Sequence, residues 1–144
     1  MSSKVLSYDD FQVGHAFPPQ RYRIDSTDAD AFLATFDHEP VQDAAGTPLR
    51  ARAGATVRPV HPTMVGSFQP QHAAFAWPTG VLHAREVVRL RQPVYPGEQL
   101  QAVVCVKDRY LKNDRKFVVL RITIDKLENQ RTAMVVERTL VWPQ

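Results

Sequence analysis

The sequence predicts an α+β fold in which a long, coiled antiparallel sheet wraps around a central helix. Two observations lead to this prediction. The back half of the chain alternates apolar and polar residues with a period of two, in runs separated by short turn sequences. An apolar segment with helical spacing precedes these runs and can supply the helix that the sheet covers. With 144 residues the chain can bury a substantial core, and we expect one domain over residues 1–144.

The first long strand is expected at residues 82–91. Its alternation would place Leu82, Ala84, Val88 and Leu90 on one face and His83, Arg85, Arg89 and Arg91 on the other. The second strand covers about Gln99–Leu111 and is followed by the turn residues Asn113 and Asp114.

The third strand alternates Val118, Leu120, Ile122 and Ile124 with Val119, Arg121, Thr123 and Asp125. A turn at residues 128–130 leads into the fourth, about Arg131–Trp142. Three consecutive strands joined by short turns form an antiparallel meander. At ~3.3 Å per residue each strand is about 40 Å long, so the sheet must coil strongly around another element. This architecture is the hot-dog fold.

Two helices are expected before the sheet. The first begins near Thr27, with Asp30 three positions later as in a capping box, and cannot continue through Pro40. Its apolar side would consist of Ala31, Phe32, Ala34, Thr35 and Phe36. The second falls within about Pro62–Phe75 and carries Met64, Val65, Phe68 and Ala74. Because Pro70 lies inside it, we expect either a kink or an early end.

The composition limits the cellular setting. Cys105 is the one cysteine, so no disulfide can form within the chain, and its place in the run Leu100–Val106 indicates core packing. No signal peptide and no apolar stretch of ~20 residues is present, which favours a cytoplasmic protein with no membrane partner. Nucleic acid is not an expected partner, because the basic residues are not interleaved with exposed aromatic residues.

The charge is unevenly distributed. The net charge is +3, yet no Asp or Glu occurs between Asp43 and Glu86, where four arginines lie: Arg50, Arg52, Arg58 and Arg85. A local positive field would suit an anionic ligand such as a nucleotide-bearing thioester. Chance spacing of surface arginines is the alternative.

Four segments, in order along the chain, carry a family resemblance. They are Tyr8–Phe17, Ser26–Phe36, Phe36–Asp43 and the stretch from Val81–His83 to Arg91–Leu100. Together they resemble the MaoC-like dehydratases and R-specific enoyl-CoA hydratases, and most closely the FAS1-like or MaoC N-terminal dehydratase domains. The resemblance implies a hot-dog fold and an acyl thioester substrate, carried by coenzyme A (CoA) or by an acyl carrier protein.

The resemblance also suggests a catalytic site, and the sequence departs from it there. In the hydratases an Asp and a His, five residues apart, share one catalytic water. Asp37 aligns with the Asp, but Gln42 stands where the His belongs, and Glu39 replaces an Asn. A glutamine amide can hold a water but does not titrate near neutral pH. We therefore expect Asp37 and Gln42 to hold the water, with another group to move the proton.

Four histidines are candidates for that group. His61 precedes the second helix, where the resemblance places the substrate tunnel, and is the preferred candidate. His38, His72 and His83 are the others, and for each of the four a surface or packing role is the alternative.

Substrate contacts are expected around the second helix and on the first long strand. Amides at the start of the helix could polarise a thioester carbonyl, which makes Met64, Gly66 and Ser67 candidate substrate-binding residues. Arg89 and Arg91 are candidate phosphate contacts. The alternatives are a capped helix start and solvated strand arginines. No metal or cofactor is expected, because no cluster with ligand spacing and no glycine-rich phosphate loop is present.

Three functions remain open. The first is a dehydratase or hydratase acting on 3-hydroxyacyl or enoyl thioesters. The second is a non-catalytic hot-dog subunit that forms the acyl tunnel for a catalytic partner, which the change to Gln42 favours. The third is an acyl-CoA thioesterase, which the absence of a carboxylate in Pro62–Trp77 disfavours. Open sheet edges predict a homodimer or a heterodimer with another hot-dog chain.

Overall fold

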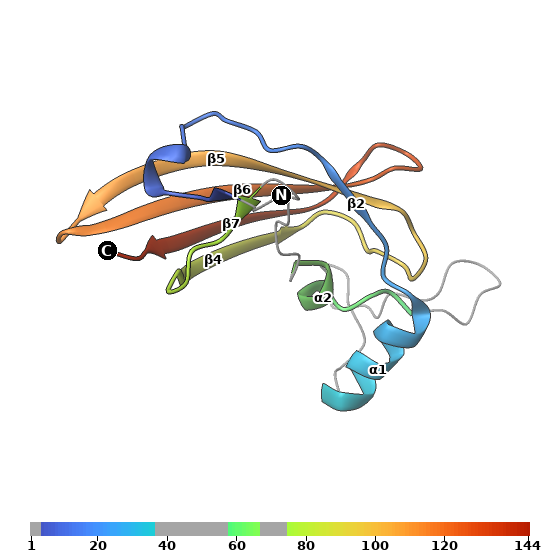
Figure 1. Ribbon diagram of the computed structural model, residues 1–144. Helices are drawn as coiled ribbons and strands as arrows, with labels where there is room; N and C mark the ends of the chain where they lie inside the picture. Colours follow the sequence, from blue (N-terminus) through green and yellow to red (C-terminus); the bar gives the residue numbers. More distant parts are fainter. Residues whose placement is uncertain (1–3, 37–57, 67–74) are drawn as a thin grey trace.

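The computed structural model describes residues 4–36, 58–66 and 75–144. Its main feature is an antiparallel sheet with the strand order β2-β5-β6-β7-β4. Its strands, shown in Figure 1, are β2 (Gln20–Tyr22), β4 (Leu82–Leu90), β5 (Leu100–Lys112), β6 (Arg115–Lys126) and β7 (Thr132–Trp142). The predicted meander is confirmed, because β5, β6 and β7 are consecutive both in the chain and in the sheet.

Short elements flank this sheet. A separate two-stranded sheet pairs β1 (Lys4–Val5) in parallel with β3 (Phe75–Ala76). A 3-10 helix, η1 (Tyr8–Asp10), follows β1, and the α-helices are α1 (Ser26–Phe36) and α2 (Pro62–Gly66). The strands β1, β2 and β3 have two or three residues each, which is too few to show an alternating pattern in the sequence.

The core lies on one face of the main sheet, which we call the helix face. Its buried side chains are Leu100, Ala102, Val104 and Val106 of β5, Val118, Leu120, Ile122 and Ile124 of β6, and Met134, Val136, Leu140 and Trp142 of β7. The β5–β6 turn is tight because Asn113 and Asp114 both adopt the left-handed conformation, with φ of 51° and 58°. Asn and Asp tolerate this conformation better than other side chains, as a two-residue hairpin requires.

The helix α2 packs against the helix face, where it contacts β7 (Figure 1). Val65 is 1% exposed, and its carbonyl accepts a hydrogen bond of 3.4 Å from the Tyr22 hydroxyl; burial raises the pKa of that tyrosine. A Cβ at Gly66 would lie 3.2 Å from Sδ of Met134, so the glycine allows the end of α2 to approach β7 closely. The chain therefore has the predicted arrangement of a helix against a long antiparallel sheet.

The helix α1 differs from its prediction. It begins at Ser26, and its buried residue is Ala29, which the predicted apolar side did not include. Phe32 is half-buried, whereas the predicted members Ala31, Ala34 and Thr35 are exposed. That prediction is wrong because α1 lies beyond the sheet rather than against its face (Figure 1), so little of its surface is covered.

The described part of the second helix lies inside its predicted range. The helix opens with Pro62 as expected, since a proline in the first turn has no N–H to leave unpaired. The described helix ends at Gly66, and Phe75 belongs to β3 instead. Phe68, Pro70, His72 and Ala74 lie outside the described residues.

A β-bulge changes the faces of β4. His83 pairs with Leu140 and Arg85 with Thr139, so one residue is inserted between them and the alternation reverses. His83 therefore shares the helix face with Glu86 and Val88, whereas the sequence pattern placed it with the arginines. A bulge of this kind leaves no signature in an alternating sequence.

Cys105 is not among the buried core residues. It is half-buried and points away from the helix face, between the buried residues Val104 and Val106. The segment before β2 runs along the edge of β5 at this point, since Ala16 forms a bridge with Cys105. Cys105 is therefore only partly packed, whereas the sequence indicated core packing.

Candidate functional site

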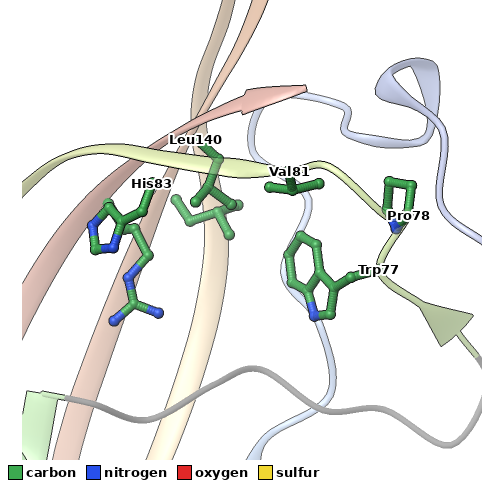
Figure 2. Close-up of a pocket in the computed structure, with 7 residues that line it drawn as sticks. Trp77, Pro78, Val81, His83 and Leu140 are labelled. Atoms are coloured by element: carbon green, nitrogen blue, oxygen red, sulfur yellow. The ribbon is translucent and has the colours of Figure 1, made fainter. Parts of the chain in front are cut away.

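Two cavities adjoin each other on the helix face, where β4 and β7 pass α2. The larger has a volume of about 470 Å³ and is lined by Pro62, Thr63, Gly66, His83, Glu86, Val88 and Arg138. The smaller has a volume of about 260 Å³ and is lined by Trp77, Pro78, Val81, His83, Leu120, Arg138 and Leu140. His83 and Arg138 belong to both. Figure 2 shows the smaller cavity, with His83 at one end and Trp77 and Pro78 at the other.

Three charged or titratable side chains meet between these cavities. Glu86 and Arg138 occupy paired positions on β4 and β7, and Nε of Arg138 donates a hydrogen bond of 2.8 Å to Oε2 of Glu86. The same carboxylate oxygen lies 3.0 Å from Nε2 of His83. A second guanidinium nitrogen of Arg138 donates a 2.9 Å hydrogen bond to the carbonyl of Gly66. We call His83, Glu86 and Arg138 the β4–β7 triad.

The triad runs from the protein interior to its surface. The side chain of Arg138 is 8% exposed, that of Glu86 is 25% exposed and that of His83 is 49% exposed. A buried cation is tolerated only when it is paired and hydrogen-bonded, which Glu86 and the carbonyl of Gly66 provide here. That carbonyl is at the end of α2, so Arg138 also caps the helix and attaches it to the sheet.

The imidazole of His83 is the titratable group that a ligand in either cavity can reach. Its Nε2 faces Glu86, and within residues 4–36, 58–66 and 75–144 its Nδ1 has no hydrogen-bonding partner. Because Nε2 faces the carboxylate of Glu86, Nδ1 is the ring nitrogen available to exchange a proton with a ligand. The arrangement is thus able to perform acid–base chemistry at one reacting atom.

His61, the histidine preferred from the sequence, lies at the start of α2. Its Nδ1 accepts a hydrogen bond of 3.2 Å from the backbone N–H of Thr63, and its ring lies 5.4 Å from that of Phe32. The ring therefore satisfies one of the unpaired N–H groups of the first helical turn and packs on α1. Its neighbours Pro62 and Thr63 line the larger cavity, but His61 is not among the residues that line either one.

The predicted site residues are only partly brought together. Gly66 lines the larger cavity, but it contributes a carbonyl to Arg138 rather than an amide to a ligand. Met64 is half-buried and packs against the core. Asp37, Gln42 and Ser67 lie outside the described residues, so the predicted pairing of Asp37 with Gln42 stays a prediction.

The two predicted phosphate contacts lie away from the cavities. Arg89 is on the outer face of β4, 3.9 Å from Glu137, and Arg91 is exposed just beyond the strand. Lys107 and Arg121 also contact Glu137, at 2.6 and 3.2 Å, and these two cations lower the pKa of Glu137. Three cations thus surround one carboxylate on the outer face.

Sequence reasoning missed Glu86 and Arg138 but could have found both. In β7, residue 138 occupies the same phase as Val136, Leu140 and Trp142, all of which point into the core. A charged residue at an inward position indicates a buried, paired cation. Glu86 left the same signal, because it lies in phase with the apolar Val88 and Leu90 of β4, and the bulge precedes all three.

A metal-binding cluster and a membrane-spanning helix are both absent from the part of the chain that the structure describes. No group of three His, Cys, Asp or Glu side chains is arranged there to hold a metal ion. No helix among these residues is long and apolar enough to cross a bilayer.

Comparisons with known proteins identify the fold. No family model matches the sequence, and no curated protein is significantly similar to it. Solved structures match over almost the whole chain. A MaoC-like dehydratase from Rhodospirillum rubrum has a TM-score of 0.67 and 17% identity, with 94% of this chain and 96% of that one covered.

Two further structures agree. An (R)-hydratase from A. caviae has a TM-score of 0.60 and 19% identity, with coverage of 92% and 98%. The 3R-hydroxyacyl-ACP dehydratase complex HadBC from Mycobacterium tuberculosis has a TM-score of 0.65 and 14% identity, with coverage of 90% and 96%. The chain therefore has the hot-dog fold of these dehydratases and hydratases, as the sequence predicted.

Proposed function

We propose that this hot-dog chain acts in the reversible hydration of enoyl thioesters and dehydration of 3-hydroxyacyl thioesters, as one domain in the cytoplasm. The observation that carries the proposal is the pair of adjoining cavities beside α2 on the helix face. The larger volume, about 470 Å³, lies within the range of ~300–1,000 Å³ typical of small-molecule sites. Apolar walls with a few convergent polar groups suit an acyl chain next to a polar thioester.

The sequence supports the same chemistry. Asp37 and Gln42 stand at the positions where the resembled hydratases hold the catalytic water, and the solved structures of similar fold include a MaoC-like dehydratase and an (R)-hydratase. A catalytic chain needs a titratable group besides Asp37, since Gln42 cannot transfer a proton.

A second candidate function is supported by a specific observation. Gln42 replaces the histidine expected from the resemblance, and one structure of similar fold, HadBC, is a complex of two chains. On this reading the chain forms the acyl tunnel for a catalytic hot-dog partner. Either reading predicts a partner along β4, which is an edge strand with exposed apolar side chains: Leu82 (60% exposed), Val88 (45%) and Leu90 (39%).

Turnover measurements with the purified chain test the proposal. A short 2-enoyl-CoA is the substrate, and three products are followed separately: hydration of the double bond, dehydration of the 3-hydroxyacyl-CoA, and release of free CoA. We expect hydration and dehydration that Asp37→Asn reduces about 10²–10⁴-fold. Asp30→Asn, an exposed aspartate of α1, is the matched control. Absence of both reactions with intact acyl-CoA binding would favour the non-catalytic subunit, and release of CoA alone would favour a thioesterase.

A further inference from the structure

The sequence leaves this chain without an acid–base residue at position 42, and the structure places a histidine, His83, where the two cavities adjoin. Of the residues that line both cavities, His83 and Arg138, only the histidine can exchange a proton near neutral pH. The guanidinium stays protonated at all such pH values. Among the cavity-lining side chains that the structure describes, His83 and Glu86 are therefore the two that could transfer a proton.

Glu86 is poorly suited to exchange that proton. Its Oε2 accepts a hydrogen bond of 2.8 Å from the buried Arg138, and the same oxygen lies 3.0 Å from His83. An oxygen that already contacts a guanidinium and an imidazole is not free to approach a ligand. Glu86 is instead placed to orient the ring of His83, as the acid of other acid–base pairs orients its histidine.

We propose that His83, positioned by Glu86 and Arg138, is the catalytic acid–base residue of this chain and acts on a 3-hydroxyacyl or enoyl thioester bound across the two cavities. This inference rests on the proposed function and selects a residue that the family resemblance does not assign and that the sequence left as one of four candidate histidines. The acyl chain would occupy the smaller cavity, between Trp77 and Leu140, and the pantetheine arm would occupy the larger one, beside Thr63. His83 lies where the two cavities meet, at the level of the thioester.

The proton balance needs one base and no further reactant. In the dehydration direction the neutral imidazole of His83 removes a proton from the α-carbon through Nδ1. The imidazolium then gives this proton to the 3-hydroxyl as its carbon–oxygen bond breaks, so that one water leaves and one carbon–carbon double bond forms. His83 is neutral again at the end, and nothing is oxidised or reduced. Hydration is the reverse sequence.

The groups that face His83 make its protonation state testable by pH. On β4 the facing charge is Glu86, on β7 it is Arg138, and α2 contributes none, since Pro62–Gly66 contains no titratable side chain. If the neutral ring is the base, kcat for dehydration falls at acidic pH as the ring becomes protonated. In Glu86→Gln the ring loses the carboxylate that orients it, so kcat should fall although His83 is still present.

The experiment compares dehydration by the wild type, His83→Gln, Glu86→Gln and His15→Gln over pH 5–9. His15 is a matched control: it is exposed and lies next to β5, towards the opposite edge of the sheet from β4. We expect His83→Gln to lower kcat by about 10²-fold or more with KM changed less than about threefold, and to lose the acidic limb. Glu86→Gln should lower kcat by about tenfold and keep the acidic limb, whereas His15→Gln should behave as the wild type.

The folding of each variant is checked by thermal unfolding, because loss of Glu86 also removes the partner of Arg138. Because His83 lies at the exposed end of the triad, His83→Gln should keep the wild-type Tm. A lower kcat at an unchanged Tm then indicates a catalytic rather than a structural role. A His83→Gln variant with wild-type kcat overturns the inference; if Asp37→Asn is then inactive, the proposed function survives without it. A wild type with no turnover overturns the acid–base role of His83 and leaves the non-catalytic reading of the chain.

Discussion

Glu86 and Arg138 face each other across β4 and β7, and their hydrogen bond of 2.8 Å joins the edge strand to a guanidinium that is almost fully buried. Breaking one side of such a pair leaves a charge in the interior without its partner. For fully buried pairs this costs about 3–5 kcal/mol. Because the side chain of Glu86 is 25% exposed, water can replace part of the lost interaction.

We therefore expect Glu86→Gln to lower the free energy of unfolding by about 1–3 kcal/mol. Urea unfolding measures it. Glu128→Gln, an exposed glutamate of the β6–β7 turn, is the matched control and should change stability by less than about 0.5 kcal/mol. Equal effects of the two substitutions would mean that Arg138 is satisfied without Glu86. The double variant Glu86→Gln/Arg138→Met should recover part of the loss, since no unpaired charge remains.

The lowered pKa of Asp10, near the N-terminus, predicts that the stability of the fold depends on pH. Its carboxylate accepts a 2.6 Å hydrogen bond from Lys4 and further hydrogen bonds from Ser7, which lower its pKa from 3.8 to about 2. A folded-state pKa below the unfolded one gives a stabilisation that is fully present above pH 3.8 and is lost as the pH falls through about 2.

The melting temperature of Asp10→Asn should accordingly lie below that of the wild type at pH 7, and the difference should disappear as the pH approaches about 2. Thermal unfolding followed by circular dichroism over this pH range provides the measurement. Asp9→Asn is the control, because the Asp9 side chain is 90% exposed and its contact with Arg109 is longer, at 3.6 Å. A difference that persists at the lowest pH would show that the asparagine acts through packing and not through the lost charge. Added salt should narrow the gap at pH 7, since these charges are exposed.

The long hairpins were predictable because they satisfy local rules. In β6 the alternation of Val118 to Ile124 with polar neighbours matches the two faces of the sheet, and the Asn113–Asp114 pair suits a turn with two left-handed residues. Each of these signals is contained in a few neighbouring residues. The fold class followed from these signals, because a sheet of three long consecutive strands must coil, and a coiled sheet packs around a helix.

The triad was not predictable in the same way. His83 changes face because of a bulge, and Glu86 meets Arg138 only through strands that lie 52 positions apart in the chain. Both features depend on how distant strands pair, and a single sequence does not show the register of that pairing. The inward phases of Glu86 and Arg138 were the local signs that charged groups point toward the core. Asp37 and Gln42 were assigned through resemblance alone, and they lie outside the described residues.

The exposed edge of β4 predicts self-association or pairing with a related chain. An unpaired strand with exposed Leu82 and Val88 is a ready partner for a second strand, and a lysine there disfavours pairing. We expect the wild type to sediment as at least a dimer at micromolar concentration and Leu82→Lys/Val88→Lys to shift toward the monomer. Leu111→Lys, at the far end of β5 and 68% exposed, is the matched control. A wild type that is strictly monomeric at this concentration would contradict homodimer formation.

Gln42→His tests whether the family's missing histidine can be restored. If Asp37 holds the catalytic water, an imidazole at position 42 supplies a second proton-transfer group, and such groups contribute about 10²–10⁴-fold to a rate. We expect the hydration rate of an enoyl-CoA to rise measurably in this variant and the rise to vanish in Gln42→His/Asp37→Asn. Gln12→His, an exposed glutamine near the N-terminus, is the control for a histidine added elsewhere. No gain over the wild type would argue against the alignment of Gln42 with the catalytic position.

Ligand binding should depend on the arginines near the end of β4. The apolar cavities would accept the acyl and pantetheine groups at roughly 25 cal/mol per Å² of apolar surface buried. Arg89 and Arg91 are exposed near the edge strand, where they can attract CoA phosphates, and exposed charges of this kind add a salt-dependent attraction. Acyl-CoA affinity should therefore weaken as the ionic strength rises.

Calorimetry with a saturated acyl-CoA, which cannot react by hydration, measures this binding directly. We expect Arg89→Ala/Arg91→Ala to raise Kd about tenfold at low salt, equivalent to about 1.4 kcal/mol, and to flatten the salt dependence. Arg115→Ala/Arg131→Ala removes the same charge from two exposed turn positions and should leave Kd close to that of the wild type. Equal losses in both double variants would mean that net charge alone attracts the ligand. If no binding is detected at millimolar acyl-CoA, the two cavities do not form a thioester tunnel, and an interaction subunit becomes the better account of the chain.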